Sequence, residues 1–595
     1  MPEFFDETRT ASVSASANVP HESQHQGCSF GVIGTLLRLP THSSFKGLRT
    51  TYQKQKRLDS GYVAPSLARS FSTSTMSLIN IRDGLIVSLC VLVHFIYKNR
   101  RRRLLPFPPG PSPWPIVKNT FTIPLINAHG YYKELGAKLG SKLLYLEALG
   151  QPMLIINDIS IAQDLLEKRS ALYSSRPAIP MLNDVVGIRT YFAFMPYGDY
   201  WRIHRRMFQQ HFSEKHLARN QERAIEFIRK GLLVNLFESP DNFDEHIRNC
   251  VGGIAVSITY GLPVQRKSDP LVRFSEETFA VANAIAAPGK FLVNVVPSLK
   301  HVPEWMPGAG FKQVAKKARV DLVKLAEEPF EATVEMMEEG TAPVCFIAET
   351  LERHRHSPDY ETQAIYAKQT AAMVFGAVSE TTVTALNTFI LGMLKRPDVL
   401  KKAQKEVDDV AGIDRLPEFS DIPRLQYLSA VIKETLRWNP VVPMGIPHYT
   451  SEEDVYMGYY IPKGCAVFAN AYAMLQDEEI FPEPQTFKPE RFIKNDRIRE
   501  DIPDPEYIAT FGFGRRICPG AHIARSTLHL AAASLLHLFD IAPALNNDGK
   551  PIEIIPQFKQ ASIIAEPLPF RCKITPRAGR DVSGLLKGYM GSDPI

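Results

Sequence analysis

The 595-residue chain has 45% apolar and 22% charged side chains, a composition typical of globular proteins with a large core. Its formal net charge of +6 is small for this length, so nothing in the composition indicates nucleic-acid binding. The seven cysteines include no CxxC pair, which argues against a disulfide framework and for a reducing compartment.

The N-terminal segment, residues 1–75, has no periodic apolar pattern and is rich in Ser, Thr and His, so we expect a poorly structured extension. Its last part is basic, hydroxylated and poor in acidic residues, as transit peptides are. A mitochondrial presequence is therefore the minor alternative for this segment. Met76 is a second candidate for the start of the protein.

An apolar stretch follows at residues 78–97, and it is about 30 Å long as a helix, enough to cross a bilayer. Lys98 and the arginines at 100–103 come next, and this basic run places the rest of the chain on the cytosolic side. A buried helix is the alternative, but the basic run and the prolines after it disfavour that reading. We predict a single-pass anchor in the endoplasmic reticulum membrane, followed by a basic, proline-rich hinge at residues 98–115.

The remainder, residues 116–595, is expected to be mostly helical. Long amphipathic runs dominate, with prolines and glycines at their ends, as at residues 164–173, 222–238 and 362–396. Strand-like pieces are short and few, at residues 141–157, 455–470 and 570–577. The chain contains no GxGxxG motif and no P-loop, so it shows no nucleotide-binding fold of its own.

A glycine-rich loop near the C-terminus, "FGFGRRICPG" at residues 511–520, holds one cysteine, Cys518. Two nearby glycines, Gly512 and Gly514, allow backbone angles that turn amide groups toward the sulfur. Arg515 and Arg516 add positive charge that would stabilise a thiolate or bind carboxylates. Zinc would need more Cys or His ligands, and a cysteine nucleophile would need a base. One thiolate with paired arginines fits an iron porphyrin.

The same loop resembles the Phe-x-x-Gly-x-Arg-x-Cys-x-Gly signature of the cytochrome P-450 haem-thiolate monooxygenases. Phe511, Gly514, Arg516, Cys518 and Gly520 stand at the matching positions. The resemblance implies a mainly α fold with small β-sheets, in one large catalytic domain at residues 116–595. It also implies heme b with the Cys518 thiolate as axial ligand, contacted by Phe511, Arg516 and Gly520.

Three further motifs of the family are present in the expected order. "KETLRW" supplies Glu434 and Arg437 on one helix face, and "FKPERF" supplies Arg491, which in the family completes a buried network with them. "WRIHR" places Trp201 and Arg205 one helical turn apart, as in the family's propionate-contacting helix. The alternative is that this segment is a basic surface helix with no contact to a cofactor.

A fourth resemblance concerns His448, which stands where the family has a basic propionate partner, and the central helix that carries Glu380 and Thr381. In the family, this acid and threonine relay protons to bound dioxygen. The chain departs from the pattern at Val378, where a second glycine is expected, and we expect Gly376, two residues earlier, to supply some of the missing backbone freedom. The alternative is that both residues are simply polar groups of a buried helix.

The resemblance implies an enzyme that inserts one oxygen atom from O2 into a hydrophobic small molecule. NADPH-derived electrons would come through a separate NADPH–cytochrome P-450 reductase, with cytochrome b5 as a further candidate partner. A redox-neutral isomerase or peroxide-rearranging enzyme is the alternative, and the acid–threonine pair favours the first.

The pocket-lining segments of the family correspond here to residues 176–194, 375–378, 441–447 and the neighbourhood of 561–564, which are mainly apolar. A hydrophobic terpenoid, polyketide or aromatic substrate is therefore expected. The chain, including "PSLKHVPEWMPGAGFK" at residues 297–312, resembles fungal enzymes of specialised metabolism, and that resemblance implies the same setting here.

Overall fold

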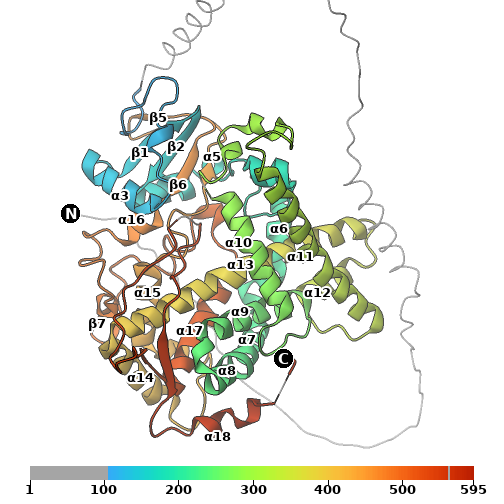
Figure 1. Ribbon diagram of the computed structural model, residues 1–595, viewed down its shortest axis with the longest axis vertical. Helices are drawn as coiled ribbons and strands as arrows, with labels where there is room; N and C mark the ends of the chain where they lie inside the picture. The colour runs from blue at the N-terminus through green and yellow to red at the C-terminus, as the bar shows by residue number, and fades with distance from the viewer. Residues whose placement is uncertain (1–104, 288, 561–562, 592) are drawn as a thin grey trace, which may run out of the picture. The chain divides into compact units, whose positions relative to one another are not determined.

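The computed structural model describes residues 105–595, apart from residues 288, 561–562 and 592. The predicted extension at residues 1–75, the predicted anchor at residues 78–97 and the hinge up to residue 104 lie outside the described residues. The described part is mostly helical with a few short strands, as the sequence predicts (Figure 1).

Most of the chain folds into helices because its apolar residues recur at helical spacing. The longer ones are α3 (Ala128–Leu139), α6 (Asp199–Phe212), α7 (Leu217–Glu226), α9 (Phe243–Tyr260), α10 (Pro270–Ala286), α11 (Phe311–Glu339), α12 (Phe346–His354), α13 (Tyr360–Lys395), α14 (Pro397–Ala411), α15 (Gln426–Trp438) and α17 (Ala521–Leu538). The shorter ones are α4 (Ile159–Ala162), α5 (Ser170–Tyr173), α8 (Val234–Glu238), α16 (Ala471–Leu475) and α18 (Val582–Leu586).

The central element is α13, which crosses the middle of the helical region (Figure 1). It is long and apolar enough to span a membrane, yet 78% of its most apolar window is buried among its neighbours. α9 packs along it in the antiparallel direction, since Asp244 near the start of α9 accepts a hydrogen bond from Asn387 and Tyr260 at its end packs edge-on against Phe375. An all-round apolar helix of this kind forms the core of a large domain.

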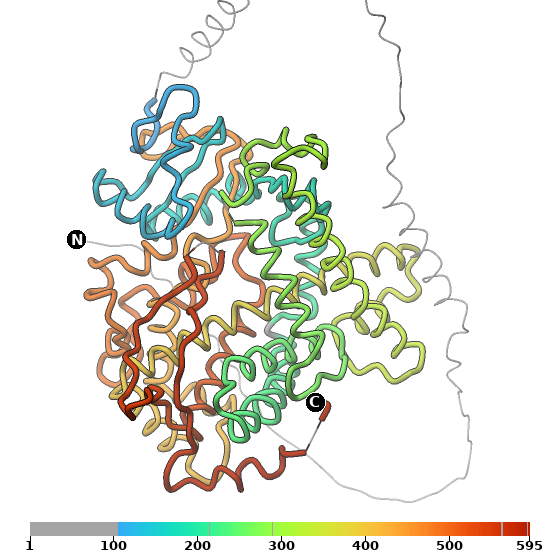
Figure 2. The backbone as a smooth tube through the Cα atoms, in the orientation of Figure 1, coloured from blue at the N-terminus to red at the C-terminus, as the bar shows by residue number. Residues whose placement is uncertain are grey.

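One four-stranded sheet has the order β1-β2-β6-β3. Its strands are β1 (Leu143–Ala148), β2 (Gln151–Ile156), β6 (Ala466–Ala469) and β3 (His448–Tyr449). β1 and β2 form an antiparallel hairpin, and β6 joins β2 in parallel although the two lie far apart in sequence (Figure 2). This pairing holds His448, on β3, next to β6, and His448 lines the cavity described below.

The remaining strands form two-stranded hairpins: β4 (Asp454–Tyr456) with β5 (Tyr459–Ile461), β7 (Ile493–Lys494) with β8 (Arg497–Ile498), and β9 (Phe539–Pro543) with β10 (Cys572–Pro576). All three strand-like pieces found in the sequence therefore contain strands.

The described end of the predicted hinge packs against this sheet. The Tyr145 amide donates to the Pro109 carbonyl at 2.9 Å, and the ring of Phe107 stacks on that of Tyr145 with centroids 4.4 Å apart. A Cβ on Gly110 would come within 1.9 Å of the Tyr145 carbonyl oxygen, so only glycine fits there. Residues 107–110 thus form part of the folded domain.

Two runs predicted as single helices have altered hydrogen bonding. The run at residues 222–238 passes through a π-helical segment, Phe227–Leu233, between α7 and α8. The run at residues 164–173 is interrupted at Arg169, whose guanidinium turns away to bind Asp454 at 2.8 Å.

Candidate active site

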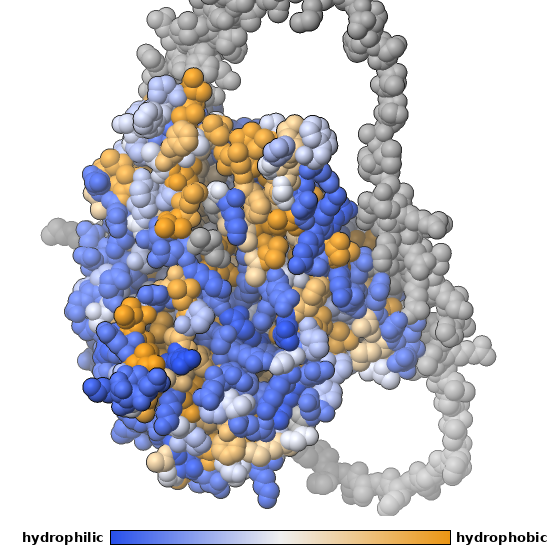
Figure 3. Space-filling view, viewed as in Figure 1, coloured by the Kyte–Doolittle hydropathy of each residue, from blue (hydrophilic) through white to orange (hydrophobic). Residues whose placement is uncertain are grey.

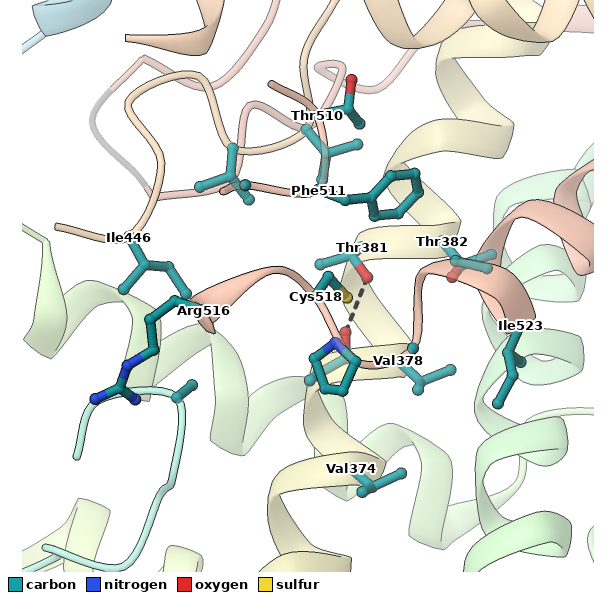
Figure 4. Close-up of a pocket in the computed structure, with 18 of the residues that line it drawn as sticks. Val374, Val378, Thr381, Thr382, Ile446, Thr510, Phe511, Arg516, Cys518 and Ile523 are labelled. Carbon is teal, nitrogen blue, oxygen red and sulfur yellow. Dashed lines mark hydrogen bonds between the residues drawn. The ribbon is translucent and has the colours of Figure 1, made fainter. Parts of the chain in front are cut away.

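An apolar cavity of about 290 Å³ lies between α6, α9, α13, α17 and the glycine-rich loop. Val374 and Val378 reach it from α13, Ile446 from the segment before β3, and Phe511 and Cys518 from the loop (Figure 4). Most of the side chains that line it are hydrocarbon, and its few polar groups gather in defined places. Such a cavity suits an apolar ligand held by a small number of directed polar contacts.

The glycine-rich loop owes its shape to backbone angles that only glycine adopts easily. Gly514 has φ +55°, and a Cβ there would lie 2.1 Å from the Leu166 carbonyl oxygen. Gly512 has φ +81°. The Cys518 amide then donates to the Phe511 carbonyl at 2.8 Å, which closes the turn before α17. The exposed surface of Cys518 belongs to the cavity wall, so its thiol faces the cavity.

The electrostatics around the thiol differ from the sequence-based expectation. Burial raises the pKa of Cys518, while the Gly520 backbone and the charges of Arg205 and Arg525 oppose that rise. The two arginines of the loop contribute in other ways: Arg515 donates to the Tyr197 hydroxyl at 3.0 Å, and Arg516 donates to backbone carbonyls. The charges that oppose the rise thus come from Arg205 and Arg525. The other role expected of the arginine pair, binding carboxylates, stays a prediction.

A cluster of three cations lies at the cavity, with Arg176 and Arg516 buried and Arg205 half-buried. Arg176 donates to the carbonyls of Ala193 and Ile446, Arg205 to that of Ile517, and Arg516 to those of Ser174 and Met195. Within the described part of the chain, none of the three guanidiniums forms an ion pair with a carboxylate. Burial lowers the pKa of all three; Arg516 falls to about 9, and repulsion from Arg205 adds to its shift.

Two predicted cofactor-binding residues complete this cluster. Trp201 of α6 packs under the Arg516 guanidinium, 4.3 Å from its ring centroid. His448 lines the cavity and uses Nδ1 to bind the Tyr173 carbonyl at 2.8 Å. Burial, followed by the charge of Arg176, lowers the pKa of His448, so this imidazole is neutral and donates through Nδ1. Because the positive charge of these guanidiniums is not balanced by a carboxylate among the described residues, the site should bind anions such as carboxylates strongly.

A second polar network lies in the core beside α15. Arg437 donates to both oxygens of Glu434, at 2.7 and 2.9 Å, and Arg491 donates to the same carboxylate at 3.0 Å. Arg437 also binds the carbonyls of Leu475 and Pro484. Glu434 and Arg437 are fully buried. The structure thus confirms that the three charged residues form one buried network.

The acid and the threonine of α13 point to different surroundings. Thr381 lines the cavity, and its hydroxyl donates to the Ala377 carbonyl at 2.9 Å (Figure 4). Glu380 is not among the residues that line the cavity, and its carboxylate accepts a hydrogen bond from Asn283 of α10. Burial and the charge of Glu566 raise the pKa of Glu380 to about 7. Glu380 can therefore hold a proton near neutral pH.

The suggestion that Gly376 supplies slack in α13 is wrong. α13 is helical throughout Tyr360–Lys395, and a Cβ at Gly376 would lie 1.7 Å from the ring of Phe279. This glycine is needed because an aromatic ring of α10 packs directly on the α13 backbone.

Comparison with known proteins decides the family. The family model described as Cytochrome P450 matches residues 108–572. The chain is 42% identical over 471 residues to "Cytochrome P450 monooxygenase ple1" of Rhodocybe pseudopiperita, covering 79% of this chain and 89% of that protein. It is 38% identical to "Cytochrome P450 monooxygenase COX1" of Coprinopsis cinerea, covering 87% and 100%. It is 35% identical to "Tryptamine 4-monooxygenase" of Psilocybe cyanescens, covering 83% and 97%. The chain belongs to the cytochrome P450 family.

This cytochrome P450 is a monooxygenase, an oxidoreductase built as one large, mainly helical domain with small sheets. Its cavity is lined by residues from most of the segments expected from the family. Within residues 176–194 the lining residues are Arg176, Phe192 and Ala193, and within 441–447 they include Val441 and Ile446. Phe375 and Gly376 do not line it, because they face Tyr260 and Phe279 instead. Residues 561–562 lie outside the described part.

Arg176 is a cavity residue that the sequence did not single out, because residues 176–194 were expected only to be mainly apolar. Arg176 is buried at the P450 cavity, whereas Arg189 of the same segment is paired with Asp184. The available signal was an arginine at the start of a mainly apolar pocket segment, since a buried cation rarely lacks an anionic partner.

Replacing Arg176 by methionine should weaken retention of an anionic cofactor in this P450. A hydrogen bond to a charged group contributes roughly 1.5–3 kcal/mol, so haem release should become about tenfold to a hundredfold faster. Transfer of haem to excess apomyoglobin measures that rate. Arg169→Met is a matched control, because Arg169 pairs with Asp454 rather than facing the cavity. An unchanged release rate in Arg176→Met would show that Arg176 does not bind the cofactor.

Proposed function

We propose that this cytochrome P450 binds heme b in the described cavity, with the Cys518 thiolate as axial ligand to the iron. The observation that carries the proposal is one cavity-facing thiol beside three guanidiniums, of which Arg176 and Arg516 are buried and Arg205 is half-buried, and none of which has a carboxylate partner among the described residues. Haem has the complementary groups: a metal cation for the sulfur and two propionates for the arginines. When bound, haem supplies the activation of O2 with electrons derived from NADPH.

Different residues around the cavity hold different parts of the haem. Arg205, Arg516 and Arg176 bind the propionates, His448 offers Nε2, and Trp201 supports the guanidinium of Arg516. Phe511 and Gly520 form the part of the wall next to the sulfur. Burial makes these charge-assisted contacts stronger than they would be in water, because no solvent competes for them.

The proposed acid–base residues are Thr381 and Glu380. Thr381 positions a proton at the cavity through its hydroxyl, which now donates to the Ala377 carbonyl at 2.9 Å. Glu380, with its pKa raised to about 7, is the reservoir that restores this proton. Because the Glu380 carboxylate is held by Asn283, its side chain must turn toward Thr381 to deliver the proton.

The substrate is proposed to be a hydrophobic small molecule, a terpenoid, polyketide or aromatic compound of fungal specialised metabolism. The cavity lining supports this, since Val251, Ile254, Val374, Val378 and Ile446 offer no group that would bind a charged substrate. One relative is named "Tryptamine 4-monooxygenase", which is consistent with an aromatic substrate for this chain too.

The enzyme is proposed to sit on the endoplasmic reticulum membrane, anchored by residues 78–97, and to receive electrons from NADPH–cytochrome P450 reductase, with cytochrome b5 as a second donor. Exposed apolar side chains support membrane contact: Trp114, Ile116, Phe121, Leu125 and Ile126 all follow the predicted anchor closely. Hydrophobic atoms gather on the end of the domain that carries the sheet (Figure 3). Recovery of a chain beginning at Met76 in the soluble fraction after carbonate extraction would refute the anchor.

The function is tested with microsomes that contain the full chain and a fungal reductase. Extracts of a strain lacking the gene, which accumulate the unused precursor, serve as the substrate source. We expect one product to gain a single oxygen atom, labelled when the gas phase is ¹⁸O2 and dependent on NADPH. An isomeric product of unchanged mass, formed without NADPH, would contradict the proposal.

A further inference from the structure

α9, α10 and the loop between β9 and β10 carry a group of charged residues, none of which lines the cavity. Arg248 of α9 binds Asp244 at 2.8 Å and also pairs with Glu566 of the loop. Glu566 also pairs with Lys559, whose side chain is 50% exposed, against 15% for Glu566. This group, which we call the rear charged cluster (Asp244, Arg248, Glu276, Lys559 and Glu566), therefore extends from solvent into the helical core.

Glu276 is the member of the rear charged cluster whose carboxyl group takes part in none of the ion pairs described above. It lies on α10 and is partly buried, and its Oε1 atom is buried without a hydrogen-bond partner among the described residues. Arg248 interacts with it electrostatically, but forms its ion pairs with Asp244 and Glu566 instead. A buried carboxyl oxygen without a donor is better tolerated when the group carries a proton.

α10 connects Glu276 with Glu380. Glu276 and Asn283 are seven residues apart, so they lie on the same face of α10, two turns from each other. Asn283 binds the Glu380 carboxylate, and between them Phe279 packs on Gly376 of α13. The face of α10 that carries Glu276 is thus the face that contacts α13 at the acid of the proposed proton relay.

We propose that Glu276 is a proton-supplying positioning residue, which restores the proton of Glu380 from solvent through the rear charged cluster. The inference rests on the proposed function of Glu380 and Thr381. In each cycle the Glu380 O–H bond breaks toward Thr381, and a proton that leaves Glu276 forms it again after passing through water, because the two carboxyl groups lie too far apart along α10 for direct transfer. Glu276 then regains a proton from water, so the step moves one proton and no electrons.

The charges around the two carboxyl groups suit this transfer. Burial raises the pKa of Glu276 to about 7, Arg248 and Arg273 oppose that rise, and Asp244 and Glu566 add to it. The pKa of Glu380 is also about 7, where Glu566 and Glu276 act to raise it and Lys559 and Arg248 to lower it. Donor and acceptor with similar pKa values exchange protons with little free-energy cost. Above about pH 7 both groups lose their protons, so supply should fail with rising pH.

The test compares Glu276→Gln with Glu277→Gln in the full-length holoenzyme. Glu277 is the adjacent residue of α10 and is exposed, so it is a matched control. The infrared band of protonated carboxyl groups, recorded on the resting ferric protein between pH 6 and 8, should contain a component that titrates near pH 7. Glu276→Gln should remove part of it and Glu277→Gln none. This measurement needs no turnover.

Turnover supplies the second measurement, with the precursor identified in the extract experiment. Glu276→Gln should divert NADPH-derived electrons to hydrogen peroxide and lower product per NADPH about tenfold, less than the roughly hundredfold loss of a direct proton donor. Substrate affinity should stay unchanged, and Glu276→Asp should restore part of the coupling. Glu276→Gln added to Glu380→Gln should cause no further loss, because the two act in series.

The inference would be overturned if Glu276→Gln formed as much product per NADPH as the wild-type protein, with the same pH profile. An infrared carboxyl band that is not diminished in Glu276→Gln would also overturn it. If Glu380→Gln is also fully coupled, the proton role proposed for Glu380 fails and the inference fails with it. A loss confined to Glu380→Gln refutes the role of Glu276 alone.

Discussion

Arg437→Ala should yield a chain that cannot retain haem, rather than a slow enzyme. Arg437 is fully buried and binds both oxygens of Glu434 and two backbone carbonyls. Removing it leaves the Glu434 charge in the core with Arg491 as its remaining side-chain partner. Breaking a buried ion pair on one side costs about 3–5 kcal/mol, a large part of the stability of an ordinary domain.

Urea unfolding of the purified protein and a haem titration measure the two effects. Lys405→Ala is the control, because Lys405 forms an exposed ion pair with Asp409 on α14, and exposed pairs contribute little to stability. The control should bind haem normally. Normal haem content and a loss below about 1 kcal/mol in Arg437→Ala would contradict the role of the buried network.

Much of this site could be predicted because its residues stand close together in the sequence. The loop at residues 511–520 contains its glycines and its cysteine within ten positions, and the close approach of Gly514 to Leu166 explains why position 514 needs glycine. The same holds for Glu434 and Arg437, which share one face of α15. The helical class also followed from local apolar periodicity, most clearly for α13.

What could not be predicted depends on contacts between distant segments. Phe279 fills the space at Gly376, almost one hundred residues later, and nothing near Gly376 in sequence indicates this. The direction of Glu380 depends on Asn283, and the charges near Cys518 come from Arg205 and Arg525 rather than from the adjacent arginines. The spacing of a motif can assign a residue to a site. Which other side chains surround that residue depends on the tertiary structure.

Cys518→Ser should abolish the sulfur–iron bond while leaving the fold intact. Serine has nearly the same shape, but its hydroxyl does not ionise as a thiol does, so it cannot replace a thiolate ligand. Haem could still be held by Arg176, Arg205 and Arg516, although more weakly. Monooxygenase turnover should fall to background, because thiolate donation favours O–O cleavage.

Cys345→Ser is the matched control for this substitution. Cys345 caps the N-terminus of α12, where its sulfur accepts a hydrogen bond from the Ala348 amide at 3.4 Å. Serine is a preferred residue at that position, so the control should fold, bind haem and turn over as the wild-type protein does.

The ferrous–carbon monoxide spectrum of the full-length protein tests the assignment of Cys518 most directly. Wild-type protein and Cys345→Ser should show the red-shifted Soret band that a thiolate ligand produces in this family, and Cys518→Ser should lack it. A thiolate-type band that persists in Cys518→Ser would contradict the assignment.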